Sequence, residues 1–440
     1  MEIAVRVLQL LLSLAILVIV HELGHYITAR IFRVRVERFY LFFNPWFSIF
    51  KFKYGETTYG MGWIPLGGYV KISGMIDESL DKEQLSKPPQ PHEFRSKPAW
   101  QRLIIMVGGV TVNILLAFVI YISVLAVWGD KYLPSEEVRY GITVDSLGHS
   151  MGLRNGDMIL AVNNKMTEDF FEIPSLILLE QAQTITVLRE GEEVVIQVPD
   201  NIIPRILQER TPGFIGIRTP FKIESVMKDS PAKQAGLQPG DRIIGVSGQY
   251  LPFFDQFRSE VSQRRGETVE ITTIRNNDTL QIPVTINAEG MIGVRPVQDM
   301  EEHFQLKEKQ FTLLQAIPAG ITRGYEGVVN YLKQLRLIFS PQTRAYESLG
   351  GFITIGSIFP ATWNWQAFWE LTAFLSIMLA IINILPIPAL DGGHVMFLLY
   401  EIISGRKPGD KFLEYAQMIG MFLLLALVIF ANANDIRRLF

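Results

Sequence analysis

Four long apolar stretches constrain this 440-residue chain more than any other feature of its sequence. Each is long enough to cross a bilayer core, which needs about 20 mostly apolar residues per helix. They lie at 1–32, 103–128, 366–390 and 415–432. Hydrophobic residues make up 48% of the chain, a high share for a soluble protein. The sequence therefore predicts a multi-pass α-helical membrane protein with about four transmembrane helices.

Basic residues in the connecting segments predict the orientation of these helices. Segment 33–102 carries eleven lysines and arginines, and segment 391–414 carries Arg406, Lys407 and Lys411. Both segments are cytoplasmic by the positive-inside rule. The long segment between the second and third spans and both termini, including the tail 433–440, are then expected on the outer side. Arg437 and Arg438 in this tail weakly contradict that orientation.

Composition excludes several classes of function. A net charge of −3 gives no indication of a nucleic-acid partner. The chain has no cysteine, which removes disulfides, thiolate metal sites and cysteine nucleophiles. Any transition-metal site must therefore be built from histidine and carboxylate.

Residues 130–305 have shorter apolar runs, more turns and interspersed charges, and they contain a repeat. The stretch SMGLRNGDMILAVNN at 150–164 matches QAGLQPGDRIIGVSG at 234–248. The two copies resemble circularly permuted bacterial PDZ domains, which implies two β-rich domains at 130–219 and 220–305. PDZ domains bind extended peptides at a sheet edge, so peptide C-termini are possible ligands. The sequence leaves open whether the copies bind peptide or are packed spacers.

Segment 306–365 is predicted to hold an amphipathic helix and a linker. The apolar residues of 311–339 fall near helical spacing, with basic residues between them. Such a helix can lie on the outer membrane surface or pack on the second repeat, and the sequence leaves both open.

The motif His21-Glu22-Leu23-Gly24-His25 stands inside the first apolar stretch. On a helix, residues at i and i+4 share a face, so two imidazoles can hold one metal ion and Glu22 can act on bound water. A glutamate in the bilayer is costly and indicates function. A zinc hydrolase needs a third ligand, and Asp391 in the broken third span is the leading candidate. Asp391 could instead cap the following helix, and His394 is a rival ligand.

These motifs resemble those of the site-2 protease family. HELGH at 21–25, NILPIPALDGGH at 383–394 and the PDZ-like pair occur in that family's order over nearly the whole chain. The resemblance implies zinc held by His21, His25 and Asp391, with Glu22 as catalytic acid and base. It also implies that Asn383 contacts the substrate backbone and that Pro386 and Pro388 shape the same loop. A His₂Asp site alone does not distinguish zinc from iron or cobalt.

The cytoplasmic segment alternates like strands around a Tyr-Gly-Glu turn at 54–56. The family has a membrane-re-entrant β-hairpin here, and the resemblance assigns substrate binding to Gly67, Gly68, Tyr69, Val70 and Lys71. An exposed strand edge can hold an unwound substrate by β-addition. In the second span, the GGVTVN stretch at 108–113 predicts close helix packing through its glycines, and Asn113 is expected to face the site.

The leading hypothesis is an intramembrane zinc endopeptidase of the bacterial inner membrane. By resemblance, its substrates are single-span anti-sigma factors in envelope-stress signalling and remnant signal peptides, with the periplasmic PDZ domains filtering substrates by size. One alternative is a membrane-anchored zincin with a cytoplasm-facing site. The other is a non-catalytic PDZ scaffold.

Overall fold

The computed structural model describes residues 2–75, 88–209, 213–297, 299–341, 343 and 345–438. Contacts divide the chain into two compact units. The membrane unit comprises Met1–Gly129, Gln310–Phe339 and Tyr346–Phe440, and the insert comprises Asp130–Lys309 and Ser340–Ala345.

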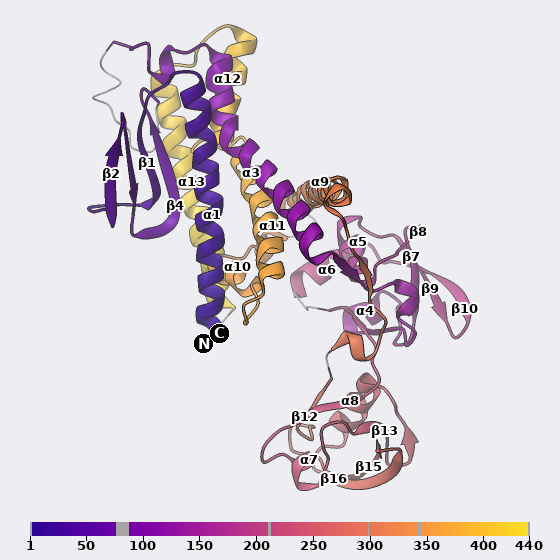
Figure 1. Cartoon of the computed structure of the whole chain (residues 1–440). Coiled ribbons are helices and arrows are strands. Elements are labelled where there is room, and N and C mark those ends of the chain that lie inside the picture. Colours follow the sequence, from indigo (N-terminus) through magenta and orange to yellow (C-terminus); the bar gives the residue numbers. More distant parts are fainter. Residues whose placement is uncertain are drawn as a thin grey trace. The chain divides into compact units, whose positions relative to one another are not determined.

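Four helices in the described part of the membrane unit are long and apolar enough to cross a bilayer. They are α1 (Glu2–Ile31), α3 (Ala99–Trp128), α11 (Trp365–Ile384) and α13 (Asp410–Arg437). The chain termini lie at the same end of this bundle (Figure 1). Helix α13 continues to Arg437, so the helix extends beyond the apolar stretch that ends at residue 432. Backbone hydrogen bonding continues a helix beyond the point where the side chains cease to be apolar.

Helix α3 is the centre of the membrane unit, because α1, α11, α12 (Asp391–Ser404) and α9 (Leu313–Phe339) all pack against it. Glycine makes the closest of these approaches possible. A Cβ atom on Gly24 would lie 2.4 Å from the carbonyl oxygen of Gly108, so the backbones of α1 and α3 touch there. Small residues allow such contact between membrane helices.

Helix α9 occupies much of the segment in which an amphipathic helix was expected. It packs against α3 and α11. A Cβ on Gly320 would meet Ile122, and one on Gly324 would meet Phe118. The helix therefore belongs to the membrane unit. After it comes the short helix α10 (Phe352–Ile358).

The segment between α1 and α3 forms a four-stranded sheet that lies beside α1 (Figure 1). Its strands are β1 (Val36–Phe43), β2 (Phe50–Tyr54), β3 (Thr57–Met61) and β4 (Ile64–Ile72), in the order β2-β3-β1-β4. The turn between β2 and β3 falls at Gly55-Glu56, as the sequence predicts. The segment contains more than the expected hairpin, because β1 lies between β3 and β4 and pairs with both. An isolated hairpin is marginally stable, and two further strands stabilise this one.

Strand β4 is an edge of this sheet and packs on α1. A Cβ on Gly68 would meet Val18 of α1 at 2.7 Å, so the absence of a side chain lets the strand approach the helix. The opposite edge strand, β2, is exposed along its whole length.

The insert contains two copies of one order of strands and helices, except that the first copy has an additional helix, α6 (Ile202–Glu209), before its last strand. The first copy comprises β6 (Ile142–Val144), α4 (Ser146–Ser150), β7 (Met158–Val162), β8 (Lys165–Met166), α5 (Ile173–Leu179), β9 (Thr184–Arg189), β10 (Glu192–Gln197), α6 and β11 (Ile215–Ile217). The second comprises β12 (Ile223–Val226), α7 (Pro231–Gln234), β13 (Arg242–Val246), β14 (Gln249–Tyr250), α8 (Phe254–Gln263), β15 (Thr268–Arg275), β16 (Asp278–Thr285) and β17 (Val294–Pro296). Their four-stranded sheets have equivalent orders, β10-β9-β7-β8 and β16-β15-β13-β14, and each copy has its own core.

The duplication extends to single hydrogen bonds. In the first copy, Arg189 donates to both carboxylate oxygens of Asp157 and to the carbonyl of Gly152, at 2.7–2.8 Å. In the second copy, Arg275 donates to Asp241 and to the carbonyl of Gly236 at the same distances. The hydrogen bonds that the two arginines donate to these aspartates raise the pKa of both guanidinium groups. These equivalent ion pairs support the interpretation of the repeat as an internal duplication.

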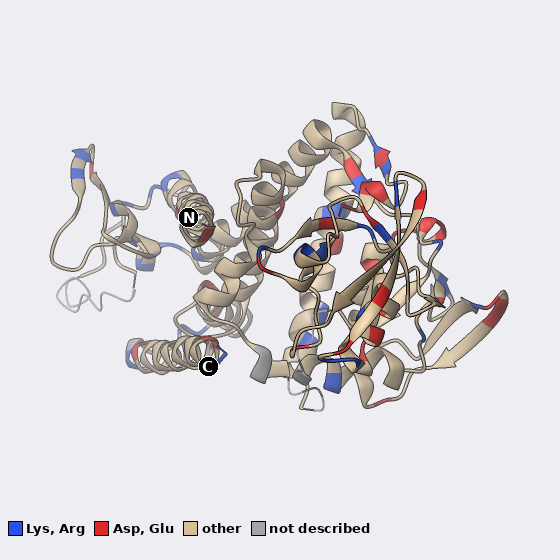
Figure 2. Cartoon of the chain, turned by 90° about the horizontal axis from the view of Figure 1, so that it is seen from below, with Lys and Arg blue, Asp and Glu red and all other residues tan. Residues whose placement is uncertain are grey.

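The chain enters and leaves the insert through a two-stranded ribbon. Strand β5 (Asp130–Tyr132) follows α3 directly and pairs antiparallel with β18 (Lys307–Lys309), which precedes α9. Charged residues are scattered over the insert (Figure 2). By sequence, α1 and α13 carry few of them between their ends.

Candidate metal centre

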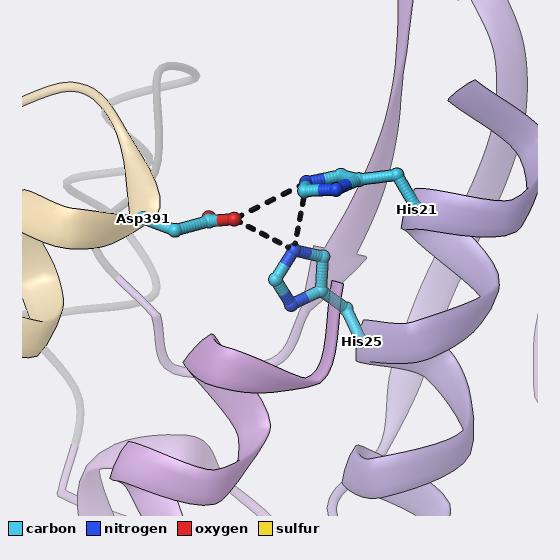
Figure 3. A group of neighbouring side chains, drawn as sticks. All are labelled: His21, His25 and Asp391. Atoms are coloured by element: carbon cyan, nitrogen blue, oxygen red, sulfur yellow. Dashed lines mark hydrogen bonds and ion pairs between the residues drawn. The ribbon is translucent and has the colours of Figure 1, made fainter. Parts of the chain in front are cut away.

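Three side chains from the two ends of the chain converge in the membrane unit (Figure 3). His21 and His25 lie one turn apart on α1, and Asp391 is the first residue of α12. The Oδ2 atom of Asp391 lies 3.1 Å from Nε2 of His21 and 3.2 Å from Nε2 of His25. The two Nε2 atoms are 3.2 Å apart. Two nitrogens and one oxygen therefore face a common point.

This arrangement fits a zinc ion. The Oδ2 atom of Asp391 is buried, and its polar neighbours are the two imidazole nitrogens; it accepts no hydrogen bond from any other described residue, and burial of a carboxylate oxygen without one is costly. A cation would satisfy it. Both histidines are buried, at 7% and 6% exposed, so water does not compete freely for their nitrogens. Three protein ligands leave a fourth position of a tetrahedral zinc site open, as a hydrolytic site requires.

A cavity of about 360 Å³ opens beside these ligands. Glu22 lines it together with the three ligand residues. Its other walls come from β1, β4, α3, α12, α13 and the loop before α12. The cavity is large enough for several water molecules or a short stretch of extended peptide.

The imidazoles are held from α3. Nδ1 of His25 lies 2.9 Å from the carbonyl oxygen of Ile105. A Cβ on Gly109 would lie 2.5 Å from Nε2 of His25 and 2.7 Å from Cε1 of His21. Sequence reasoning assigned both glycines of this stretch to helix packing, but only Gly108 faces the backbone of α1. Gly109 instead leaves room for the two rings.

Two asparagines approach His21 from other helices. Nδ2 of Asn113 lies 3.3 Å from Nδ1 of His21, and Nδ2 of Asn383 lies 3.4 Å from its Nε2. Asn113 is fully buried on α3, and Asn383 is near the end of α11. Both residues singled out in the sequence therefore adjoin the three candidate ligands.

The loop between α11 and α12 holds Pro386 and Pro388. Ala389 follows with a φ of +86°, which is strained for a residue with a side chain, and it lines the cavity. Helix α13 packs directly on this loop, because a Cβ on Gly420 would overlap the carbonyl oxygen of Pro388. The sequence contains no signal for this contact, since helix periodicity does not identify a partner.

Three of the five β4 residues assigned to substrate binding line the cavity: Gly68, Tyr69 and Val70. Tyr69 stacks on Tyr40 and donates a hydrogen bond to Oδ1 of Asn44 at 3.0 Å. Lys71 instead lies 3.6 Å from Oε2 of Glu37. Gly67, with a φ of +135°, is not among the cavity residues.

The sequence left two alternatives to Asp391 as the third ligand: Asp391 could cap the following helix, and His394 could be the ligand. Leu390, not Asp391, occupies the N-cap position of α12. His394 lines the cavity. The group of ligand atoms that converge among the described residues consists of His21, His25 and Asp391, and His394 is not part of it. Gln417 of α13 also lines the cavity and was missed. A polar side chain within an apolar span was the available signal for it.

Two histidines and an aspartate in an arrangement that fits zinc, beside a glutamate and within a bundle of membrane-length helices, are typical of the class of intramembrane zinc metalloproteases. The chain belongs to peptidase family M50, whose model matches residues 9–427. It is a zinc metalloprotease of the site-2 type.

Curated relatives match over almost their full length. The regulator of sigma E protease of Haemophilus influenzae is 29% identical, with 98% of each chain covered. That of Salmonella typhimurium is 28% identical at the same coverage. A third relative, from Neisseria meningitidis, is named as a zinc metalloprotease. It is 29% identical, and the match covers 98% of this chain and 99% of the relative's chain. Among solved structures, a PDZ domain from Listeria monocytogenes matches 19% of this chain and 92% of its own, at 25% identity and a TM-score of 0.17.

Proposed function

We propose that this protein is an endopeptidase that cleaves the transmembrane segments of single-span proteins, with His21, His25 and Asp391 as zinc ligands and Glu22 as the catalytic acid and base. The convergence of the three ligand atoms beside a cavity that Glu22 lines carries the proposal. When bound, zinc supplies the Lewis acidity that activates water and polarises a carbonyl group.

Glu22 follows a ligand directly on α1, and its carboxylate shares the cavity with the three ligands. In the proposed mechanism it accepts the proton of the attacking water and delivers it to the leaving amine. Asn383, whose amide lies 3.4 Å from Nε2 of His21, is close enough to the ligands to hydrogen-bond a substrate carbonyl bound there.

A helical substrate must unwind, because a helix uses its peptide groups in internal hydrogen bonds. Strand β4 is a sheet edge, and three of its residues line the cavity. We assign it to hold the unwound segment by strand addition, with the loop at Pro386 and Pro388 on the other side of the substrate. The roles of Gly67 and Lys71 in this binding are supported by resemblance alone.

Zinc analysis combined with cleavage of a single-span substrate in detergent tests the proposal. We expect wild type to contain about one zinc per chain and to cut within the span. Glu22→Gln should retain the metal and lose cleavage. Glu192→Gln is the matched control, because this glutamate is exposed on β10, and it should behave like wild type.

The opposite results would reject the proposal in different ways. Wild type without metal would favour the PDZ scaffold. Cleavage by Glu22→Gln at the wild-type rate would remove Glu22 from the mechanism. Cleavage of a soluble peptide, but not of a span, would favour a cytoplasm-facing zincin.

The relatives named regulators of sigma E protease support an anti-sigma factor as the substrate class, with remnant signal peptides as a second class. We place the protein in a bacterial inner membrane with the insert and both termini in the periplasm, an orientation that rests on the basic cytoplasmic segments. The two PDZ-like copies would then exclude substrates with bulky outer domains, and they offer sheet edges for peptide C-termini.

The filter can be tested with substrates alone. Two substrates with the same span, one with and one without a folded outer domain, should differ in cleavage rate when both are presented to the full chain. Equal rates would mean that the insert does not select by size.

A further inference from the structure

The two candidate histidine ligands differ in how their second ring nitrogen is held. In a neutral imidazole one nitrogen carries the proton and the other offers a lone pair. Nδ1 of His25 faces the carbonyl oxygen of Ile105 at 2.9 Å, and a carbonyl can only accept. Nδ1 therefore carries the proton, and Nε2 of His25 is free to bind a metal.

For His21 the equivalent partner is the side-chain amide of Asn113, 3.3 Å from Nδ1. The structure turns the amide nitrogen, Nδ2, toward the ring. A donor in this position requires Nδ1 to accept, which puts the proton on Nε2. Nε2 is the nitrogen that faces Asp391 and His25, so a proton there excludes metal binding through it.

The other end of the same amide resolves this conflict. Oδ1 of Asn113 is buried and has no hydrogen-bond partner among the described residues. A half-turn of the amide brings Oδ1 to His21, where it accepts a hydrogen bond from Nδ1, and the two orientations have nearly the same shape. In either orientation, the end of the amide that points away from His21 has no partner among the described residues. The choice between the two orientations therefore depends on which nitrogen of His21 carries the proton.

We propose that Asn113 is a positioning residue that presents Oδ1 to Nδ1–H of His21 and so fixes the tautomer in which Nε2 binds zinc. This rests on the proposed role of His21 as a ligand. The hydrogen bond also fixes the ring plane, as the outer partners of metal-bound histidines generally do.

The surroundings support a fixed position for this side chain. Asn113 is 0% exposed on α3. Its backbone carbonyl accepts a hydrogen bond from the hydroxyl of Ser376 on α11 at 2.7 Å. Asn113 therefore contacts both His21 of α1 and Ser376 of α11 from its place on α3.

Zinc affinity, measured by competition with a chromogenic chelator, tests the proposal without depending on catalysis. Asn113→Leu keeps the approximate volume but removes the acceptor, and it should weaken zinc binding about 10- to 100-fold. Asn113→Asp keeps an acceptor at the same place, and its affinity should remain within about tenfold of wild type. Ser376→Ala is the control for packing, since it leaves the amide of Asn113 intact and should bind zinc like wild type.

Three results would overturn the proposal. Wild-type affinity in Asn113→Leu would show that Nδ1 needs no acceptor. Equal losses in the Leu and Asp variants, or an equal loss in Ser376→Ala, would assign the effect to packing. Thermal unfolding of the metal-free variants shows whether each one folds. Failure of wild type to bind zinc would reject the proposed function itself, which separates the two claims.

Discussion

Replacement of Gly109 by alanine should remove zinc while leaving the fold intact. The added methyl group would lie 2.5 Å from Nε2 of His25 and 2.9 Å from Nε2 of His21. Alanine is otherwise the better residue in a helix interior, by about 1 kcal/mol over glycine. The substitution therefore acts on the two ligand atoms and not on the stability of α3.

The size of the displacement follows from these contacts. Ordinary van der Waals contact begins near 3.4 Å, so Nε2 of His25 would have to move by about 0.9 Å. Zinc–ligand distances tolerate about 0.2 Å. We therefore expect zinc affinity to fall by at least about 100-fold, which corresponds to about 2.7 kcal/mol.

The assay compares zinc affinity, by chelator competition, with thermal unfolding of the metal-free protein. Gly356→Ala on α10 is the matched control, because its methyl group would meet Leu10 at an ordinary 3.4 Å. The control should bind zinc normally. Wild-type zinc affinity in Gly109→Ala would refute the reasoning, since both imidazoles would then have to lie elsewhere. A loss accompanied by unfolding would also count against it.

Three further predictions concern other parts of the molecule. Gly420→Ala should push α13 off the carbonyl of Pro388 and lower kcat/KM by tenfold or more at unchanged zinc content; unchanged kinetics would exclude α13 as a support of the loop. Asp241→Asn should weaken the ion pair with Arg275 and destabilise the second repeat by about 2–3 kcal/mol in calorimetry, whereas exposed Asp278→Asn should not. Removal of metal by a chelator should abolish cleavage, and added zinc should restore it; cleavage that survives metal removal would contradict a metalloprotease.

The sequence predicted local features well, because helix geometry converts spacing into position. His21 and His25 are four residues apart, and that spacing alone places them on one face of α1. Four apolar stretches also predicted four helices of membrane-spanning length, because a helix rises by a fixed distance per residue. The Tyr-Gly-Glu turn likewise follows from local alternation and a glycine.

Contacts between distant segments were not accessible in the same way. Alternation predicted strands in the segment between α1 and α3 but not that β1 lies between β3 and β4. The amphipathic pattern of α9 predicted a buried face without identifying α3 as the helix that buries it. A periodic pattern states that a face is apolar, and tertiary packing selects its partner.

The sequence by itself determined the chemistry of this protein: a chain without cysteine, with HExxH in one membrane span and an Asp-Gly-Gly break in another, has few uses other than hydrolysis at a metal. Only the tertiary structure decided the geometry. It brings Oδ2 of Asp391 within 3.2 Å of both imidazoles, makes Gly109 the space for the rings and puts Asn113 against Nδ1 of His21. The physical reason is that residue types and short spacings specify which bonds are possible, whereas the packing of helices far apart in the chain specifies which atoms meet.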